Sequence, residues 1–236
     1  IGWAKKWAES SLRIIMDNLS RVVFPLFSRI QSDKKKQRVV IEKVLKYQSM
    51  IMIPASLGMA ILMPLIIDIL PQYDKWRPAL PIFYIFVASS LFSSYSTPLI
   101  NFFNGIGKVS LSLTFMAAWT IMTWLLLVPL SRMYGIYGYP LTVLILSTSF
   151  ILVVFKARSF VKFDFLGIIM KYLISGFAMA ILLFLMKPIT FSFGILGIPL
   201  IVALGGGMYY LILRYVFKDN LLDEFDELIR PLLKRS

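Results

Sequence analysis

The strongest constraint on this chain is a series of apolar stretches, each about as long as a membrane is thick. A helix needs about 20 consecutive apolar residues to cross the hydrocarbon core of a bilayer. Beyond the first thirty residues, such stretches occur at about 48–70, 80–103, 109–130, 137–155, 165–186 and 192–216. Together with a first helix that starts at Trp3, they predict seven crossings joined by short connections. Because a helix satisfies its own backbone polar groups in lipid, the sequence predicts an all-α integral membrane protein.

Composition agrees with this fold class and excludes several activities. Hydrophobic residues make up 58% of the chain and charged residues 16%, whereas soluble domains carry about 25% charged residues. Cysteine and histidine are both absent from the sequence. The chain therefore has no disulfide, no thiol nucleophile, no imidazole acid or base and none of the usual zinc ligands. No cofactor and no metal site is predicted.

The basic residues of the chain, whose net charge is +13, gather in alternate connections. One side receives Lys34 to Lys46, Lys108, the connection at 156–162 and the tail from Arg214 onward. The positive-inside rule makes that side cytoplasmic, which predicts a multi-pass protein of the cell's inner or plasma membrane with a cytoplasmic C-terminus. Nucleic-acid binding would need a soluble basic face and is excluded. Seven crossings then place Ile1 outside, so we expect the chain to be the C-terminal part of a longer protein.

The last residues differ from the rest of the chain. From 218 to 236, apolar residues recur at helical spacing with four acidic residues between them, up to Pro231. This pattern predicts an amphipathic helix on the cytoplasmic surface. The predicted organisation is five spans in residues 1–158, two further spans in 159–217 and this tail in 218–236.

The first helix carries a charged stripe that a membrane helix must accommodate. A charge facing lipid at mid-membrane costs ~2.5–3.5 kcal/mol, so the stripe must face protein or water. Three interpretations remain open: the charges neutralise one another inside the bundle, the helix lies flat on the membrane, or the stripe lines a hydrated cavity that handles a charged cargo. With Lys6 the stripe is net positive, and arginine binds phosphate through its planar fork of donors. The stripe repeats every four residues: Lys5, Glu9, Arg13, Asp17 and Arg21.

Three segments carry a resemblance to a known family. Residues 20–33 (SRVVFPLFSRIQSD), 69–81 (ILPQYDKWRPALP) and 101–108 (NFFNGIGK) occur in the order and spacing of three landmarks of polysaccharide and O-antigen lipid flippases. The chain resembles the Wzx-type members of the multidrug/oligosaccharidyl-lipid/polysaccharide exporter superfamily over its whole length. Gln72 stands where that family usually has a glycine before the tryptophan turn.

The resemblance implies a MATE-like transporter of two lobes and fourteen helices, of which this chain resembles helices eight to fourteen. Residues 1–158 would form the second lobe, and the last two spans would border a groove for a lipid tail. Such proteins are transporters rather than enzymes. By alternating access they move an oligosaccharide on polyprenyl pyrophosphate from the cytoplasmic to the outer leaflet for surface polysaccharide biosynthesis. The implied partners are that lipid-linked oligosaccharide, membrane lipid, the N-terminal lobe of the same protein, and a polysaccharide polymerase and ligase.

With this cargo, position suggests roles for the residues of the first helix. Arg13 and Arg21 are predicted to contact the pyrophosphate, and Lys5 or Lys6 to meet it near the outer mouth. Glu9 and Asp17 would hold the arginines and are candidates to exchange a proton or a sodium ion that drives the cycle. Predicted sugar-binding residues are Asn18 and Ser20.

Other polar residues within the spans have simpler expected roles. Tyr95, Asn101 and Asn104 are expected to make helix–helix hydrogen bonds, and Lys171 to extend toward the headgroups. There are three alternatives to a flippase, of which a drug exporter of the same superfamily would share its fold. A drug exporter of the same superfamily usually has a cavity led by acidic residues, and a membrane-embedded glycosyltransferase or polymerase would need acids on an outside loop. A non-transporting assembly subunit gives no reason for the charged stripe.

Overall fold

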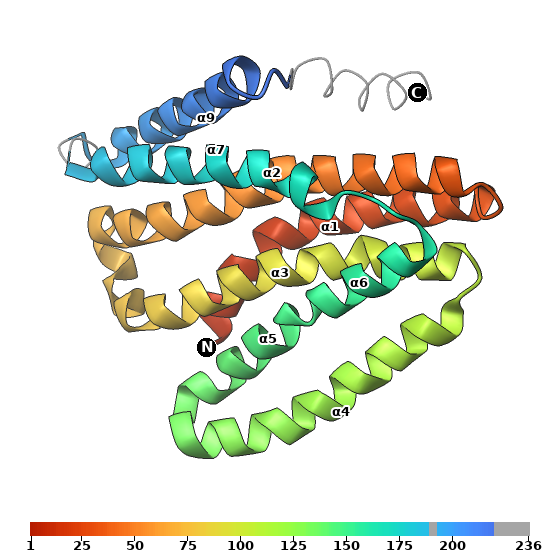
Figure 1. The fold of residues 1–236 in the computed structure, drawn as a ribbon. Coiled ribbons are helices and arrows are strands. Elements are labelled where there is room, and N and C mark those ends of the chain that lie inside the picture. The colour runs from red at the N-terminus through yellow and green to blue at the C-terminus, as the bar shows by residue number, and fades with distance from the viewer. Residues whose placement is uncertain (189–192, 220–236) are drawn as a thin grey trace.

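Every regular element that the structure describes is a helix. This computed structural model describes residues 1–188 and 193–219, and within them the side chains of residues 10–23 lie outside the description. The elements are α1 (Gly2–Arg29), α2 (Lys34–Ile69), the short helix η1 (Pro71–Ala79), α3 (Leu80–Gly105), α4 (Val109–Tyr134), η2 (Gly135–Tyr137), α5 (Gly138–Thr148), α6 (Phe150–Phe160), α7 (Phe165–Leu185), η3 (Gly194–Leu196) and α9 (Gly197–Tyr215) (Figure 1). The predicted tail helix falls almost wholly in residues 220–236, outside the described residues.

Five of the described stretches are long and apolar enough to cross a membrane. The third of them contains two predicted crossings, because α4 and the α5–α6 run lie antiparallel to each other (Figure 1). α1, much of it described by its backbone alone, is not among the five. The chain is an all-α integral membrane protein, which confirms the predicted fold class. The five stretches are Lys34–Ile69, Pro71–Gly105, Val109–Phe160, Phe165–Leu185 and Gly194–Tyr215.

Local sequence signals set several helix ends. The side chain of Asp33 accepts hydrogen bonds from the backbone N–H groups of Lys35 and Lys36 and so caps the start of α2. Asp164 caps α7 in the same way by accepting from the N–H of Gly167. α4 ends at Gly135, whose φ of +56° is a left-handed conformation that glycine adopts without strain.

Several prolines lie inside long helices. Pro25 lies inside α1, which continues to Arg29. Pro54 and Pro64 likewise lie inside α2, which is one helix from Lys34 to Ile69. A proline removes one backbone hydrogen bond, and packing against neighbouring helices keeps the segment helical in a membrane bundle.

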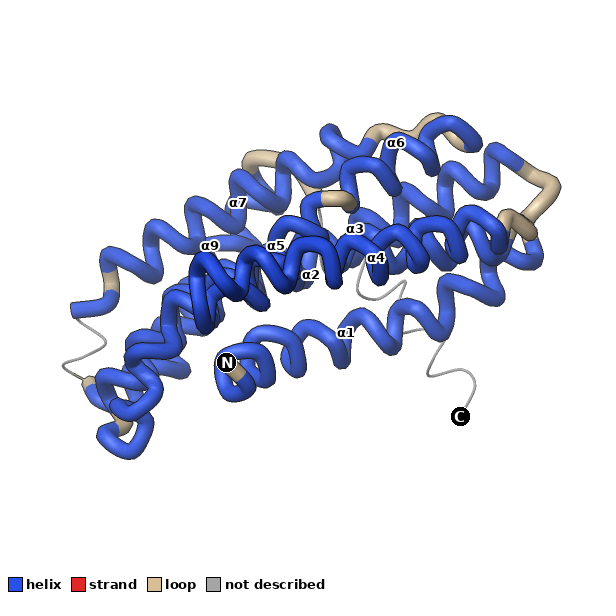
Figure 2. The backbone as a smooth tube through the Cα atoms, turned by 90° about the horizontal axis from the view of Figure 1, so that it is seen from below, coloured by secondary structure: helices blue, strands red, loops and turns tan. Residues whose placement is uncertain are grey.

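The pair α1 and α3 forms the centre of one half of the bundle. The two helices run in the same direction, because Ala4 and Ala8 share a cluster with Phe83 at their starts while Phe27 packs edge-on against Phe102 at their ends. Figure 2 shows α1 on one face of the layer that the other helices form. The helices approach closely at Gly105, where an added Cβ would lie 2.5 Å from the Cβ of Phe27.

The other half of the bundle packs around α2, which contacts α3, α7 and α9. α9 contains three consecutive glycines, Gly205, Gly206 and Gly207. A Cβ added at Gly205 would lie 2.6 Å from Cδ2 of Leu183, whereas Gly206 and Gly207 face open space. Of the three, Gly205 is therefore the one at which α7 and α9 approach closely.

Large apolar side chains cover the outer surface of the bundle. Ser112 is the one buried residue of α4, while Leu113, Trp124 and Met133 on the same helix are more than half exposed. α7 and α9 present Phe184 and Tyr215 in the same way. A continuous apolar exterior of this extent is unfavourable in water and suits contact with lipid.

The connections gather at two opposite ends of the bundle. At one end, here called the basic end, lie the connections 30–33, 106–108 and 161–164 (right of Figure 1). At the other, here called the η1 end, lie η1 and the α4–α5 turn (left of Figure 1). The basic residues thus concentrate at one end, as their alternation along the sequence predicts.

Candidate functional site

Of the predicted site residues, three at the start of α1 have described side chains. Nζ of Lys5 donates a hydrogen bond to the hydroxyl oxygen of Tyr139, 2.6 Å away, and lies 3.8 Å from Oε1 of Glu9. Lys6 is exposed. The four-residue interval thus produces an ion pair between Lys5 and Glu9, as it does on any helix. Tyr139, at the start of α5, is a partner that sequence reasoning missed.

The other predicted site residues lie outside the described side chains. They are Arg13, Asp17, Asn18, Ser20 and Arg21. The backbone of α1 is helical from Gly2 to Arg29, so the four-residue interval of the charged residues follows one slowly winding stripe. Their roles in binding and ion coupling remain predictions.

A polar cavity lies between α3, α4 and α5. Its volume is about 520 Å³, and its walls mix polar with apolar side chains. α3 contributes Ser93, Ser96, Thr97, Ile100, Asn101 and Asn104; α4 contributes Met116, Trp119 and Thr123; α5 contributes Tyr139, Val143, Leu146 and Ser147. A cavity of this size and mixed lining is typical of small-molecule sites. Three of the lining hydroxyls, those of Ser93, Thr123 and Ser147, donate to backbone oxygens of their own helices and keep their lone pairs available to a ligand or water.

The polar residues of α3 form one stripe toward this cavity. Ser93, Thr97, Asn101 and Asn104 follow one another at intervals of four, four and three, which keeps them on one helix face. Within the described residues, Oδ1 of Asn104 is buried without a hydrogen-bond partner. A buried carbonyl oxygen left unpaired is unfavourable. Asn101 and Asn104 were expected to make helix–helix hydrogen bonds; in the structure both residues line the cavity.

Tyr95 lies on a different face of α3 and makes a helix–helix hydrogen bond, as predicted from the sequence. Its hydroxyl lies 3.2 Å from that of Ser49 on α2, and Gln48 donates to Ser94 nearby. These contacts join α2 to α3 across sequence separations that no local pattern reveals.

The periodic spacing of Ser93, Thr97 and Asn101 was the signal by which the polar face of α3 could have been recognised.

Tyr139 connects the polar cavity with the charged start of α1. Its ring lines the cavity, its hydroxyl accepts from Lys5, and Nζ of Lys5 lies 5.1 Å from the ring centroid. Trp119 also lines the cavity, and its Nε1 donates to Oγ of Ser149 at the α5–α6 junction, 2.7 Å away. Charged, aromatic and hydroxyl groups therefore meet in one region between helices that are distant in sequence.

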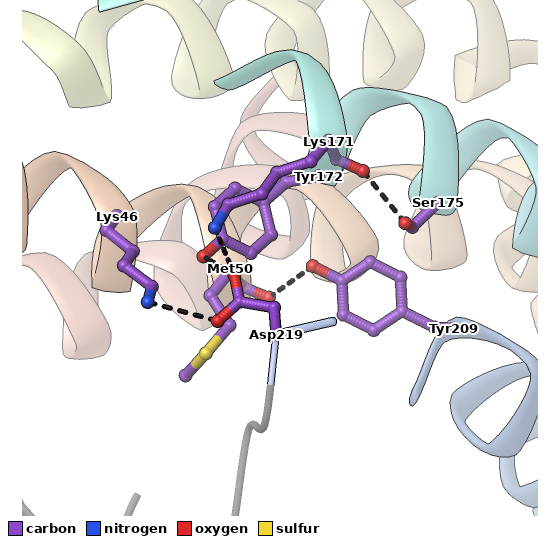
Figure 3. A network of polar contacts seen from close by, with 7 residues as sticks. All are labelled: Lys46, Met50, Lys171, Tyr172, Ser175, Tyr209 and Asp219. Carbon is purple, nitrogen blue, oxygen red and sulfur yellow. Dashed lines mark hydrogen bonds and ion pairs between the residues drawn. The ribbon is translucent and has the colours of Figure 1, made fainter. Parts of the chain in front are cut away.

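A second polar cluster joins α2, α7 and the segment after α9 (Figure 3). The carboxylate of Asp219 is 7% exposed; its Oδ1 lies 3.0 Å from Nζ of Lys46, and its Oδ2 pairs with Nζ of Lys171. Tyr172 donates to the same Oδ2 at 3.2 Å, and the hydroxyl of Tyr209 donates to the backbone oxygen of Met50. Lys171 was expected to extend toward headgroups; its ammonium instead pairs with Asp219.

The surroundings of Asp219 favour its charged form. Burial alone would raise the pKa of this carboxyl, but the hydrogen bonds from Lys171 and Lys46 outweigh burial, so the pKa of Asp219 lies below its ordinary value. Backbone geometry directs the carboxylate inward, because Lys218 has a left-handed φ of +53° and the N–H of Asp219 donates to the oxygen of Leu213. The cluster fixes the chain after α9 to α2 and α7.

Two comparisons relate this chain to known proteins. Residues 2–81 match a family model described as "Polysaccharide biosynthesis protein". Over 101 residues, the chain is 29% identical to the lipopolysaccharide biosynthesis protein WzxC of Escherichia coli (strain K12). This aligned region covers 41% of this chain and 20% of WzxC. The match therefore spans about a fifth of the relative's length. No solved structure matches the chain.

These matches agree with the fold. The family match covers α1, α2 and η1, which include the charged stripe and two of the three segments that carry the resemblance. An all-α membrane bundle with apolar outer surfaces is the architecture that the resemblance implies. The similarity to the polysaccharide biosynthesis family over residues 2–81 thus confirms that the chain resembles the Wzx-type polysaccharide exporters.

Proposed function

We propose that this chain is the C-terminal part of a flippase that moves an oligosaccharide on polyprenyl pyrophosphate across the membrane by alternating access. The cargo passes from the cytoplasmic to the outer leaflet and serves surface polysaccharide biosynthesis. The basic end then faces the cytoplasm and the η1 end faces outward. The similarity to polysaccharide biosynthesis proteins supports the class of cargo.

The observation that carries the proposal is the polar cavity beside the charged start of α1. A glycan needs many hydrogen-bonding partners, and α3 offers hydroxyl and amide groups on one face. Lys5 reaches the same region through Tyr139 and brings a positive charge suited to an anionic cargo. The exposed apolar surfaces of α7 and α9 give a lipid tail a place to lie during transfer.

Small-molecule export is the alternative that shares this fold. An exporter of cationic drugs needs carboxylates in its cavity, and the described lining of the polar cavity consists of hydroxyl, amide, aromatic and aliphatic side chains. This lining favours a hydroxyl-rich cargo over a cation. The test below separates the two, because drug export and glycan export have different readouts.

The test replaces Arg13 and Arg21 by alanine in the full-length protein. A flippase loses surface polysaccharide and accumulates lipid-linked precursor in the cytoplasmic leaflet, at unchanged protein levels. If glycan export is unchanged, the arginines form ion pairs within the bundle and do not contact cargo. If drug efflux falls while glycan export persists, the protein is an exporter of small molecules.

A further inference from the structure

A second cavity, separate from the polar one, opens at the η1 end between α1 and η1. Its volume is about 400 Å³, and it shares no lining residue with the polar cavity. Three of the five tryptophans of the chain contribute to it. The cavity is lined by Trp3, Trp7, Gln72, Tyr73, Lys75 and Trp76.

Ring contacts hold two of these tryptophans, Trp3 and Trp76, in fixed positions. The ring of Trp3 stacks on that of Trp76 with centroids 5.1 Å apart and planes within 6° of parallel. Trp3 also packs against Phe83 of α3, with centroids 6.5 Å apart. Two indoles from distant parts of the chain are therefore fixed against each other and against the core. Trp7, one turn further along α1, is 42% exposed and leaves part of its ring available.

Polar donors surround these rings. Gln72 and Lys75 are exposed, and Nζ of Lys75 lies 5.6 Å from the centroid of Trp76. The acids nearby are engaged elsewhere, because Arg77 pairs with Oδ1 of Asp68 at 2.8 Å and with Oδ1 of Asp74 at 3.0 Å. The rim of the cavity therefore combines an amide and an ammonium group with an aromatic floor.

We propose that this tryptophan cavity is an accessory site that binds one pyranose ring of the glycan. The C–H groups on one face of a pyranose carry partial positive charge and stack on the electron-rich face of an indole. Its hydroxyl groups accept from Gln72 and Lys75, and Lys75 adds a preference for sugars that bear a carboxylate. The inference rests on the proposed function, and it assigns the site to the outward-facing end, where the glycan arrives.

An interfacial aromatic belt is the competing explanation for these tryptophans. Indoles gather at membrane surfaces because they have an apolar body and a polar N–H. A belt requires only rings that face lipid. It does not require a concave site, or an amide and an ammonium group beside the rings. Trp124 of α4, 66% exposed and outside both cavities, supplies a control for the loss of an exposed indole away from the site.

The experiment uses the full-length protein in detergent and the lipid-free oligosaccharide released from the cell's own surface polysaccharide, with calorimetric titration as the readout. Trp7→Ala removes an exposed ring and leaves the Trp3–Trp76 stack in place. We expect it to weaken binding about fivefold to tenfold, with partial recovery in Trp7→Phe and wild-type affinity in Trp124→Ala. Lys75→Gln should weaken binding of carboxylated sugars more than that of neutral ones.

Three outcomes overturn the site. The wild-type protein does not bind the oligosaccharide, or Trp7→Ala binds it as well as wild type does; either result assigns the rings to the belt. If Trp124→Ala loses as much affinity as Trp7→Ala, the effect is not specific to the cavity. Failure of the flippase proposal is distinguishable. In that case the Arg13 and Arg21 variants lose drug efflux while glycan export persists, and the effect of Trp7→Ala on oligosaccharide binding is read independently.

Discussion

Replacement of Asp219 by asparagine tests whether the cluster of Figure 3 holds the end of α9 in place. The carboxylate lies between Lys46 and Lys171, whose side chains are each 23% exposed, and is itself 7% exposed. Exposed ion pairs contribute about 0.2–1 kcal/mol, and breaking a fully buried pair costs about 3–5 kcal/mol. Because the lysines retain access to water, we expect Asp219→Asn to lower the free energy of unfolding by about 2 kcal/mol.

The assay is unfolding of the full-length protein by a denaturing-detergent titration, followed by tryptophan fluorescence. A cycle with Lys171→Met isolates the pair, and the interaction energy should be about 1 kcal/mol or more. Asp74→Asn is the matched control, because its carboxylate is 67% exposed and pairs with Arg77 at 3.0 Å; its effect should be much smaller. Equal effects of the two asparagine substitutions would refute the reasoning from burial.

The depressed pKa of Asp219 also predicts the direction of a pH effect. A carboxyl whose pKa is lower in the folded state stabilises that state above its unfolded pKa of about 4. This stabilisation is lost as the pH falls through the lower folded-state value. The difference in stability between wild type and Asp219→Asn should therefore be complete at neutral pH and shrink only below about pH 4. A difference that disappears near pH 6 would contradict the ion pairs.

Two further substitutions test the packing and the polar cavity. Gly105→Ala should lower the free energy of unfolding by about 1–3 kcal/mol in the same titration, because the new Cβ would lie 2.5 Å from Cβ of Phe27. The control Gly206→Ala should have little effect, because Gly206 faces open space. Thr123→Val removes a hydroxyl from the polar cavity and should reduce glycan export about threefold to tenfold, the equivalent of one hydrogen bond. Thr120→Val on the same helix is the control: Thr120 lies outside the cavity, and like Thr123 it donates to the backbone oxygen four residues earlier. Equal losses of glycan export in the two variants would exclude the cavity as the cause.

Much of the fold could be predicted because membrane helices are specified locally. The length of each apolar run and the alternation of basic connections both depend on residues near one another in sequence. The charged interval at the start of α1 gave the Lys5–Glu9 pair for the same reason.

The candidate sites could be predicted only in part. The face of α3 that carries Asn101 and Asn104 was recognisable as polar, but nothing in the chain indicated that α4 and α5 leave a cavity against it. The stack of Trp3 on Trp76 likewise joins residues that only folding brings together.

The sequence by itself determined the class of protein, the order of its helices and the end at which positive charge gathers, because hydrophobicity, capping and charge spacing act over one or two helical turns. Tertiary structure decided which polar groups meet: Lys5 with Tyr139, 134 residues apart, and Lys171 with Asp219, 48 residues apart. Such contacts depend on how helices pack, and packing depends on the shapes of whole surfaces rather than on any local pattern.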